Sequence, residues 1–230
     1  MAVHLEKEIE KLKKRIILFG GMIEKNLENA MRSIQAKDSD LARQVLAADD
    51  LADQWEVDTE EECLKILALH QPVAGDLRFI IAVLKINNDL ERIGDEAVNI
   101  AERSLRISPL TLPGQPVDFA PLCRRVQEAL SSSLDSLVRL DAPLAQRVRN
   151  SDDVIDEMVR DLFARIKDEI RKYPGQTDQL VEYLRVCRHL ERIADHATNI
   201  AEDVIYMIEG SIIRHRHAEK TAGEGGQVAP

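Results

Sequence analysis

Apolar residues recur every three or four positions along most of the chain, which is the spacing of one face of an α-helix. Near the N-terminus the pattern runs from Leu5 through Ile9, Leu12 and Ile16 to Phe19. Short polar or proline-containing segments interrupt the pattern, and these predict the ends of helices. The sequence therefore predicts six helices, at residues 5–34, 39–70, 74–106, 117–140, 143–173 and 176–209.

Two parts of the chain repeat each other. The segment LERIGDEAVNIAE at residues 90–102 recurs as LERIADHATNIAE at residues 190–202, an offset of 100. Residues 38–53 recur more loosely at 141–156, an offset of 103. Each copy holds three predicted helices, and short connections make consecutive helices antiparallel. We therefore expect an all-α fold of two tandem three-helix bundles related by internal duplication.

A proline-rich segment separates the two copies. Residues 108–116 contain three prolines and a glycine, which is typical of a linker and not of a helix. The expected domains are therefore a first bundle at residues 1–107 and a second bundle at residues 117–210. The tail at residues 211–230 has no apolar periodicity, and we expect it to be disordered.

Composition excludes several classes of protein. Charged residues make up 31% of the 230 residues and hydrophobic residues 44%, which excludes an intrinsically disordered chain. Aromatic residues make up only 3%, and glycine and proline are few, which argues against an all-β fold. The net charge of −10 argues against nucleic acid as a partner, because the phosphate backbone binds basic surfaces.

Cysteine content and hydropathy bear on the cellular compartment. The three cysteines, Cys63, Cys123 and Cys187, are odd in number, far apart and without CxxC spacing, which indicates reduced thiols. No segment approaches the ~18 apolar residues that a membrane-spanning helix needs. We therefore expect a cytoplasmic protein without a membrane span.

Pairs of carboxylates four residues apart occur at matching places in both copies. Residues four apart lie on one side of a helix. Asp53 lies as far before the predicted turn at residues 71–73 as Glu91 lies after it, so the pairs of two antiparallel helices reach the same height. Carboxylates gathered in this way repel one another unless a cation neutralises them. The candidate metal ligands are Asp49, Asp53, Glu91, Asp95, Asp152, Asp156, Glu191 and Asp195.

Spacing alone leaves two interpretations of these carboxylates open. Ligand sets made only of oxygen suit hard cations such as Mg²⁺, Mn²⁺, Ca²⁺ or ferric iron. Alternatively, Arg92, Arg103 and Arg192 neutralise the acidic stripes as surface ion pairs, which are the commoner fate of charged helix faces.

The two copies differ beside the candidate ligands. Glu56 and Glu60 continue the acidic stripe of the first copy, whereas Val159 and Phe163 stand at the matching positions of the second. The first site is therefore the richer in potential ligands. His196 is interpreted as a polar surface histidine in preference to a ligand or a hydrogen-bond donor to one.

Motifs that signal catalysis are missing from the sequence. It contains no GxxxxGK[ST], GxGxxG or GxSxG motif, and no glutamate precedes a histidine by three residues as ferritin-like di-iron sites require. We therefore expect a protein that is not an enzyme. The competing hypotheses are a metal-dependent enzyme of unknown substrate and a helical adaptor, with or without bound ions.

The repeated LERI(G/A)D…NIAE segments resemble the PhoU family of accessory regulators of phosphate-specific transport. Further matches to the family pattern are the GGM sequence at residues 20–22, DSDLA at 38–42 and QPVAGDLR at 71–78. The resemblance covers about residues 5–210. It implies a duplicated three-helix-bundle fold, commonly dimeric, and an E/D-x-x-x-D motif that binds metal clusters at the surface. That motif falls on the eight carboxylates named above, and the metal (iron, Mn, Mg or Zn) stays open.

The resemblance also implies a function in signalling. PhoU-like proteins act in the cytoplasm at the inner membrane face, without spanning the membrane. They link the phosphate ABC transporter and its ATPase subunit to the phosphate-sensing histidine kinase. When phosphate is plentiful, they restrain phosphate uptake and repress the phosphate-starvation response.

Overall fold

The computed structural model describes residues 2–107 and 117–210. These residues form eight α-helices and one 3-10 helix without any strand, which confirms the expected all-α class. The helices of the first repeat are α1 (Ala2–Ala36), α2 (Ser39–Ala47), α3 (Asp49–His70) and α4 (Ala74–Ile107). Those of the second are α5 (Ala120–Arg139), α6 (Ala142–Asn150), α7 (Asp152–Lys172), η1 (Pro174–Gln176) and α8 (Thr177–Glu209).

Two of the six predicted helices are each broken in two, which corrects the sequence-based expectation. The first break lies at Ala48, whose N–H donates to the Val45 carbonyl three residues back, at 3.1 Å. The second lies at Ser151, whose N–H donates to Val148 in the same way, at 3.0 Å. Apolar periodicity does not reveal these breaks, because buried residues continue on both sides of each one.

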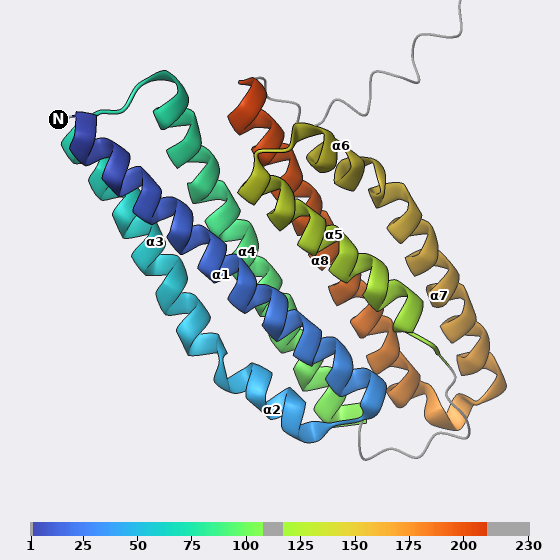
Figure 1. Cartoon of the computed structure of the whole chain (residues 1–230). Helices are drawn as coiled ribbons and strands as arrows, with labels where there is room; N and C mark the ends of the chain where they lie inside the picture. The colour runs from blue at the N-terminus through green and yellow to red at the C-terminus, as the bar shows by residue number, and fades with distance from the viewer. Residues whose placement is uncertain (1, 108–116, 211–230) are drawn as a thin grey trace, which may run out of the picture.

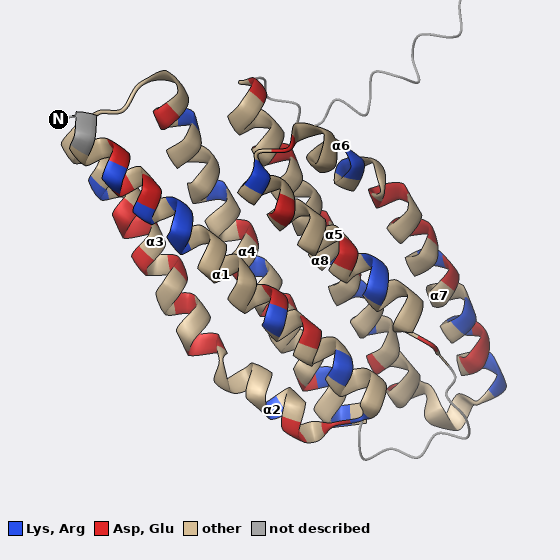
Figure 2. Cartoon of the chain, viewed as in Figure 1, with Lys and Arg blue, Asp and Glu red and all other residues tan. Residues whose placement is uncertain are grey.

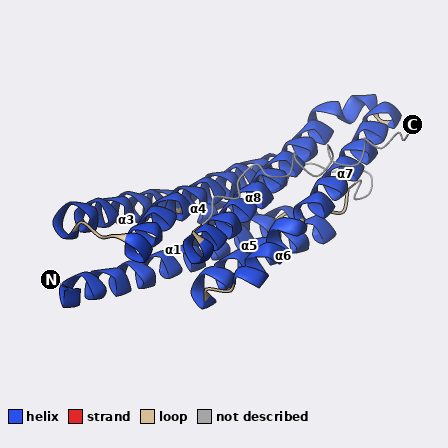
Figure 3. Ribbon diagram, turned by 90° about the horizontal axis from the view of Figure 1, so that it is seen from above, coloured by secondary structure: helices blue, strands red, loops and turns tan. Residues whose placement is uncertain are grey.

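Four helices form one layer of the molecule, and two more cover one side of it (Figures 1 and 3). At the centre of the layer lie α4 and α8, which contact each other more extensively than any other two described helices. At the edges, α3 packs on α4 and α7 packs on α8. On one side of the layer, α1 packs on α4, α5 packs on α8, and the two contact each other. The two repeats are therefore related by an approximate twofold rotation about an axis perpendicular to the layer.

Ion pairs across the centre show that α4 and α8 are antiparallel. Lys85, early in α4, donates to Asp203, late in α8, at 3.3 Å. Arg103, late in α4, donates to Glu182, early in α8, at 3.2 Å. The short connections within each repeat and this antiparallel pairing together produce the duplicated bundle predicted from the sequence.

Buried carboxylates of α4 meet histidines of α8 in the contact between the repeats. His196 Nδ1 lies 2.8 Å from Asp89 Oδ1, and His189 Nδ1 lies 2.5 Å from Glu96 Oε2. Asp89 and Glu96 are each only 7% exposed. The His196 side chain is still 24% exposed, but it is not a free surface histidine, because it bonds Asp89 of the other repeat. At these two contacts α4 supplies the carboxylate and α8 the imidazole, whereas Lys85 and Arg103 pair in the opposite sense.

A single apolar core extends through both repeats. The α4 residues assigned to the apolar sector, such as Val83, Ile86 and Leu90, are fully buried, so the helical periodicity correctly identified the core face. The side chain of Leu134 in α5 lies against Gly20 in α1, where the glycine lets the two helices approach closely. The carboxylates described below lie outside this core.

The three cysteines are buried and form no disulfide. Burial raises the pKa of each thiol, of Cys63, Cys123 and Cys187 alike, to about 12. Among the described residues, no helix combines the length and the apolar character needed to cross a bilayer. The expected linker at residues 108–116 and the expected disordered tail at residues 211–230 lie outside the described residues.

Candidate metal centre

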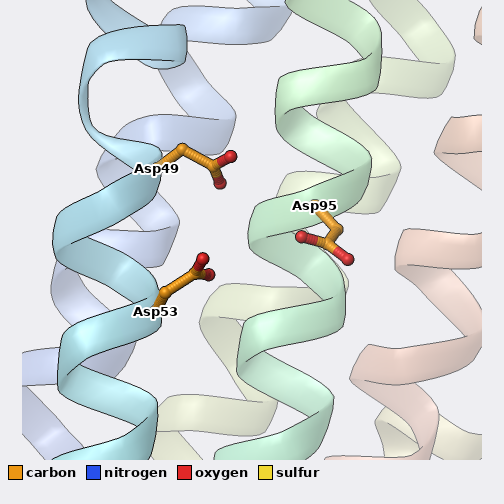
Figure 4. A group of neighbouring side chains, drawn as sticks. All are labelled: Asp49, Asp53 and Asp95. Atoms are coloured by element: carbon orange, nitrogen blue, oxygen red, sulfur yellow. The ribbon is translucent and has the colours of Figure 1, made fainter.

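Three aspartates from two helices converge on the surface of the first repeat (Figure 4). Asp49 is the first residue of α3, Asp53 follows one turn later, and Asp95 comes from α4. One carboxylate oxygen of each lies within 4.8 Å of the oxygens from the other two. Metal–oxygen distances of about 2.0–2.6 Å allow ligand oxygens up to about 5 Å apart, so a single cation can contact all three.

The break before α3 positions Asp49 in this group. Because α2 ends at Ala47 and α3 begins at Asp49, both Asp49 and Asp50 lie in the first turn of α3. Unpaired N–H groups at a helix start favour negative charge, so this is a stable place for two carboxylates. A continuous helix over residues 39–70 would instead place Asp49 in mid-helix.

Glu91 lies one turn before Asp95 on α4 and is the fourth predicted ligand of this repeat. Its Oε2 atom is enclosed and accepts no hydrogen bond from any described residue, although Arg92 Nε lies 3.3 Å away. Burial, followed by the charge of Asp95, raises the pKa of Glu91. Arg92 is therefore its one ion-pair partner among the described residues, and an enclosed carboxylate oxygen without a hydrogen bond can accept a cation as a further partner.

The carboxylates of this cluster raise one another's pKa. For Asp49, burial is the largest cause, followed by the charges of Asp53 and Asp95. Burial is also the main cause for Asp95, where Arg92 opposes the shift. Burial and Glu60 raise the pKa of Glu56 beside the cluster. The group therefore carries more negative charge than its protein surroundings neutralise.

The arginines that the sequence offered as neutralising partners are mostly engaged elsewhere. Arg103 pairs with Glu182 at 3.2 Å and Arg192 with Glu96 at 2.8 Å, both across the α4–α8 contact. Of these three arginines, only Arg92 reaches predicted ligands, at 3.3 Å from Glu91 and 3.9 Å from Asp95. Within the described part of the chain, no basic side chain forms an ion pair with Asp49 or Asp53.

The second repeat also places its four predicted carboxylates near one another, but less closely than the aspartates of the first repeat. Burial, followed by the charges of Asp152, Glu191 and Asp156, raises the pKa of Asp195 to about 6. Thr198 donates to Asp152 at 3.2 Å, and Arg188 pairs with Glu191 at 2.7 Å. Of the described carboxylates, only Asp49, Asp53 and Asp95 of the first repeat form a group of three whose oxygens lie within 4.8 Å of one another.

The raised pKa of Asp195 predicts a pH dependence of stability in the metal-free protein. Because the folded protein holds this proton more tightly than the unfolded chain, stability falls as the pH rises from 3.8 to about 6. The Asp195→Asn variant has no titrating carboxyl group at this position, so its free energy of unfolding is expected to fall less over this pH interval. Urea unfolding with a chelator at several pH values measures the difference. Asp161→Asn, an exposed site on α7, is the control, and equal pH slopes in wild type and Asp195→Asn would contradict the prediction.

One family model matches each repeat in turn. The model described as the PhoU domain matches residues 16–104 and 120–204, which together include nearly all of the helices described above. The chain belongs to the PhoU family. The resemblance inferred from the repeated segments is thereby confirmed.

Curated relatives and solved structures agree with this family. A protein of Pseudomonas aeruginosa called phosphate-specific transport system accessory protein PhoU homolog is 36% identical, with 90% of this chain and 86% of the relative covered. The homolog of Aquifex aeolicus is 37% identical, with 94% and 98% covered. The crystal structure of PhoU from P. aeruginosa superposes with a TM-score of 0.87 at 35% identity, covering 90% of this chain and 99% of that one.

A more distant structure has the same fold. The phosphate transport system regulatory protein PhoU from Streptococcus pneumoniae has a TM-score of 0.83 at 25% identity, covering 91% of this chain and 99% of that one. The overall fold is therefore shared with PhoU proteins of two bacteria whose sequences differ substantially from this one.

Proposed function

We propose that this protein is an accessory regulator of phosphate transport that restrains phosphate uptake and the phosphate-starvation response when phosphate is plentiful. The observation that carries the proposal is the match of both repeats to the PhoU model, together with relatives named as phosphate-specific transport system accessory proteins. These relatives are 32–37% identical over at least 90% of this chain.

The proposed partners are the ATPase subunit of the phosphate ABC transporter and the phosphate-sensing histidine kinase. The protein acts at the cytoplasmic face of the inner membrane, as a homodimer. The long layer of α3, α4, α8 and α7 supports this role, because it offers an extended surface on which partner proteins can dock.

A hard cation held by the first repeat is part of the proposal. Asp49, Asp53 and Asp95 supply the converging oxygens, and the enclosed oxygen of Glu91 lies beside them. In the second repeat, Asp152, Asp156, Glu191 and Asp195 are the proposed ligands. A bound cation would neutralise these carboxylates and fix α3 against α4, and α7 against α8.

Deletion of the gene tests the proposed function. In medium with abundant phosphate, the deletion strain is expected to produce alkaline phosphatase constitutively, because the restraint on the starvation response is lost. Reintroducing the full chain is expected to restore repression. Phosphatase activity measured during growth with high and low phosphate provides the readout.

Normal repression in the deletion strain would refute the proposal. The matched control is a strain that carries the chain with Arg124→Glu and Arg125→Glu, two exposed substitutions on α5 away from the carboxylates. This strain is expected to repress phosphatase as the wild type does.

A further inference from the structure

A buried asparagine joins the two helices that carry the first-repeat carboxylates. Asn87 of α4 is only 1% exposed, and its Nδ2 atom donates to the backbone carbonyl of Glu56 in α3 at 2.9 Å. Its Oδ1 atom is also enclosed and accepts no hydrogen bond from any described residue. A buried amide with an unpaired oxygen adds little stability, because the cost of burying that oxygen offsets the one hydrogen bond. Stability alone therefore does not account for an amide at this position.

This asparagine lies one helical turn from the nearest predicted metal ligand of α4. Glu91 follows it by four residues and Asp95 by eight, on the same side of the helix. On α3, Asp53 lies three residues before Glu56, and Asp49 lies seven residues before it. The two helices are joined by a short turn and are antiparallel (Figure 1). At ~1.5 Å rise per residue, the hydrogen bond therefore places each of these α3 aspartates within about 1.5 Å of the height of a carboxylate on α4.

Electrostatic repulsion opposes this alignment of α3 and α4. The α3 helix carries eight acidic side chains and a single lysine, which Figure 2 shows as a run of red with little blue. Besides burial, which is the largest cause, the charges of Asp53 and Asp95 raise the pKa of Asp49. Asn87 is uncharged and bonds the backbone of α3, so it holds the helix without neutralising any carboxylate.

A side-chain amide is missing at the matching position of the second repeat. With the offset of 100 residues, Asn87 corresponds to Cys187, which is fully buried. In that repeat, Thr198 of α8 donates to the carboxylate of Asp152 in α7 at 3.2 Å, and so engages a predicted ligand. The residue that corresponds to Thr198 in α4 is Val98, which cannot donate in this way. The bond between helices thus uses the backbone in the first repeat, and this is the repeat whose three aspartates converge within 4.8 Å.

A single buried asparagine can fix the register of packed helices. In coiled coils, one such residue specifies the alignment of the helices at a cost in stability. Register is critical for a metal centre, because the distances from metal to ligand tolerate deviations of only about 0.2 Å. A slip of α3 by one residue would move its carboxylates by ~1.5 Å along the helix axis, which far exceeds that tolerance.

We propose that Asn87 is a positioning residue for the metal centre of the first repeat. It acts through the ligands and is not one of them. By holding the α3 backbone at Glu56, it fixes the height of the two α3 aspartates relative to Asp95. This inference rests on the cation that the proposed function assigns to these aspartates.

Removing the amide tests this role. The parent protein carries Asp152→Asn, Asp156→Asn and Asp195→Asn, which remove the aspartates of the second repeat. In this parent, Asn87→Leu and Asn87→Ala are each expected to raise the dissociation constant for Mn²⁺ by about 10–100-fold, the range typical of residues that support a metal ligand. Leucine retains the volume of the side chain, and alanine avoids overpacking. Titration with Mn²⁺, followed by the electron paramagnetic resonance signal of the free ion, measures the constant on folded protein.

A second measurement separates positioning from a general contribution to the fold. Urea unfolding with a chelator reports stability without metal, and Asn87→Leu is expected to retain the parent's unfolding midpoint, because an apolar residue of similar shape also removes the unpaired oxygen. The matched control is Ser104→Ala. Ser104 is a buried polar residue of α4, 1% exposed and nine residues beyond Asp95. This control is expected to bind Mn²⁺ as tightly as the parent.

The outcomes distinguish the role of Asn87 from the metal centre itself. If the parent binds no Mn²⁺, the proposed metal centre and the role of Asn87 are both wrong. If the parent binds Mn²⁺ and both Asn87 variants bind it as tightly, only the role of Asn87 is wrong. An equal loss of affinity in Ser104→Ala would also overturn that role, because the effect would then be common to buried polar residues of α4. Repression of phosphatase is measured separately, so neither result alters the test of the regulatory function.

Discussion

Replacing Asp49, Asp53 and Asp95 together with asparagine is expected to abolish metal binding by the first repeat. These three side chains supply the converging oxygens, and an amide provides no negative charge to a hard cation. Even the loss of a residue that only supports a metal ligand lowers metal affinity by about 10–100-fold. The loss of three ligands is therefore expected to lower the affinity by more than this. A metal present at 1,000 times its dissociation constant stabilises the folded protein by about 4 kcal/mol, and the variant is expected to lose this increment.

Elemental analysis of the purified protein and thermal unfolding with and without added metal measure both effects. Asp152→Asn, Asp156→Asn and Asp195→Asn should remove the metal of the second repeat and leave that of the first. The control carries Glu128→Gln, Asp135→Asn and Asp161→Asn, exposed acidic residues that change the net charge equally. The site assignment is wrong if the variant with Asp49, Asp53 and Asp95 replaced binds as much metal as the wild type and is stabilised by it to the same extent.

Truncating Phe19 to alanine is expected to cause the largest loss of stability in the first repeat. Its ring is fully buried and stacks on Trp55 of α3, with the centroids 6.5 Å apart. Removing a buried phenylalanine ring costs about 3–5 kcal/mol, because the lost contacts leave a cavity that closes only in part. For a chain of this size, the melting temperature is expected to fall by about 6–20 °C.

The same substitution is also expected to weaken metal binding, because Trp55 lies on the helix that supplies Asp49 and Asp53. Urea unfolding and metal titration of one preparation measure both properties. The neighbouring Leu18 is 62% exposed, so Leu18→Ala should change stability by no more than about 0.5 kcal/mol. Equal stabilities for Phe19→Ala and Leu18→Ala would contradict the proposed role of the Phe19–Trp55 contact.

The sequence predicted the helical architecture because helix formation depends on local spacing. Apolar residues three and four apart identified the core faces, and the recurrence of residues 90–102 at 190–202 identified the duplication. Counting along antiparallel neighbours was sufficient to place Asp49 and Asp53 near Asp95, because the turn at residues 71–73 fixes the register of α3 against α4.

The breaks at Ala48 and Ser151 could not be predicted in this way. Both sides of each break bury apolar residues, so the periodicity continues through it. In the folded chain, α2 packs on α4 and α6 packs on α8 on the far side of each break. The break at Ala48 places Asp49 at a helix start and so completes the aspartate group.

By itself, the sequence determined that this protein is a duplicated helical bundle with recurring carboxylate pairs, because both properties are encoded within short segments. Only the tertiary structure decided which charges remain for a ligand. Arg103, Arg192 and His196 are engaged across the α4–α8 contact, with partners between 79 and 107 residues away in the chain. The register of two helices so distant in sequence depends on how the repeats pack, and local periodicity does not encode it.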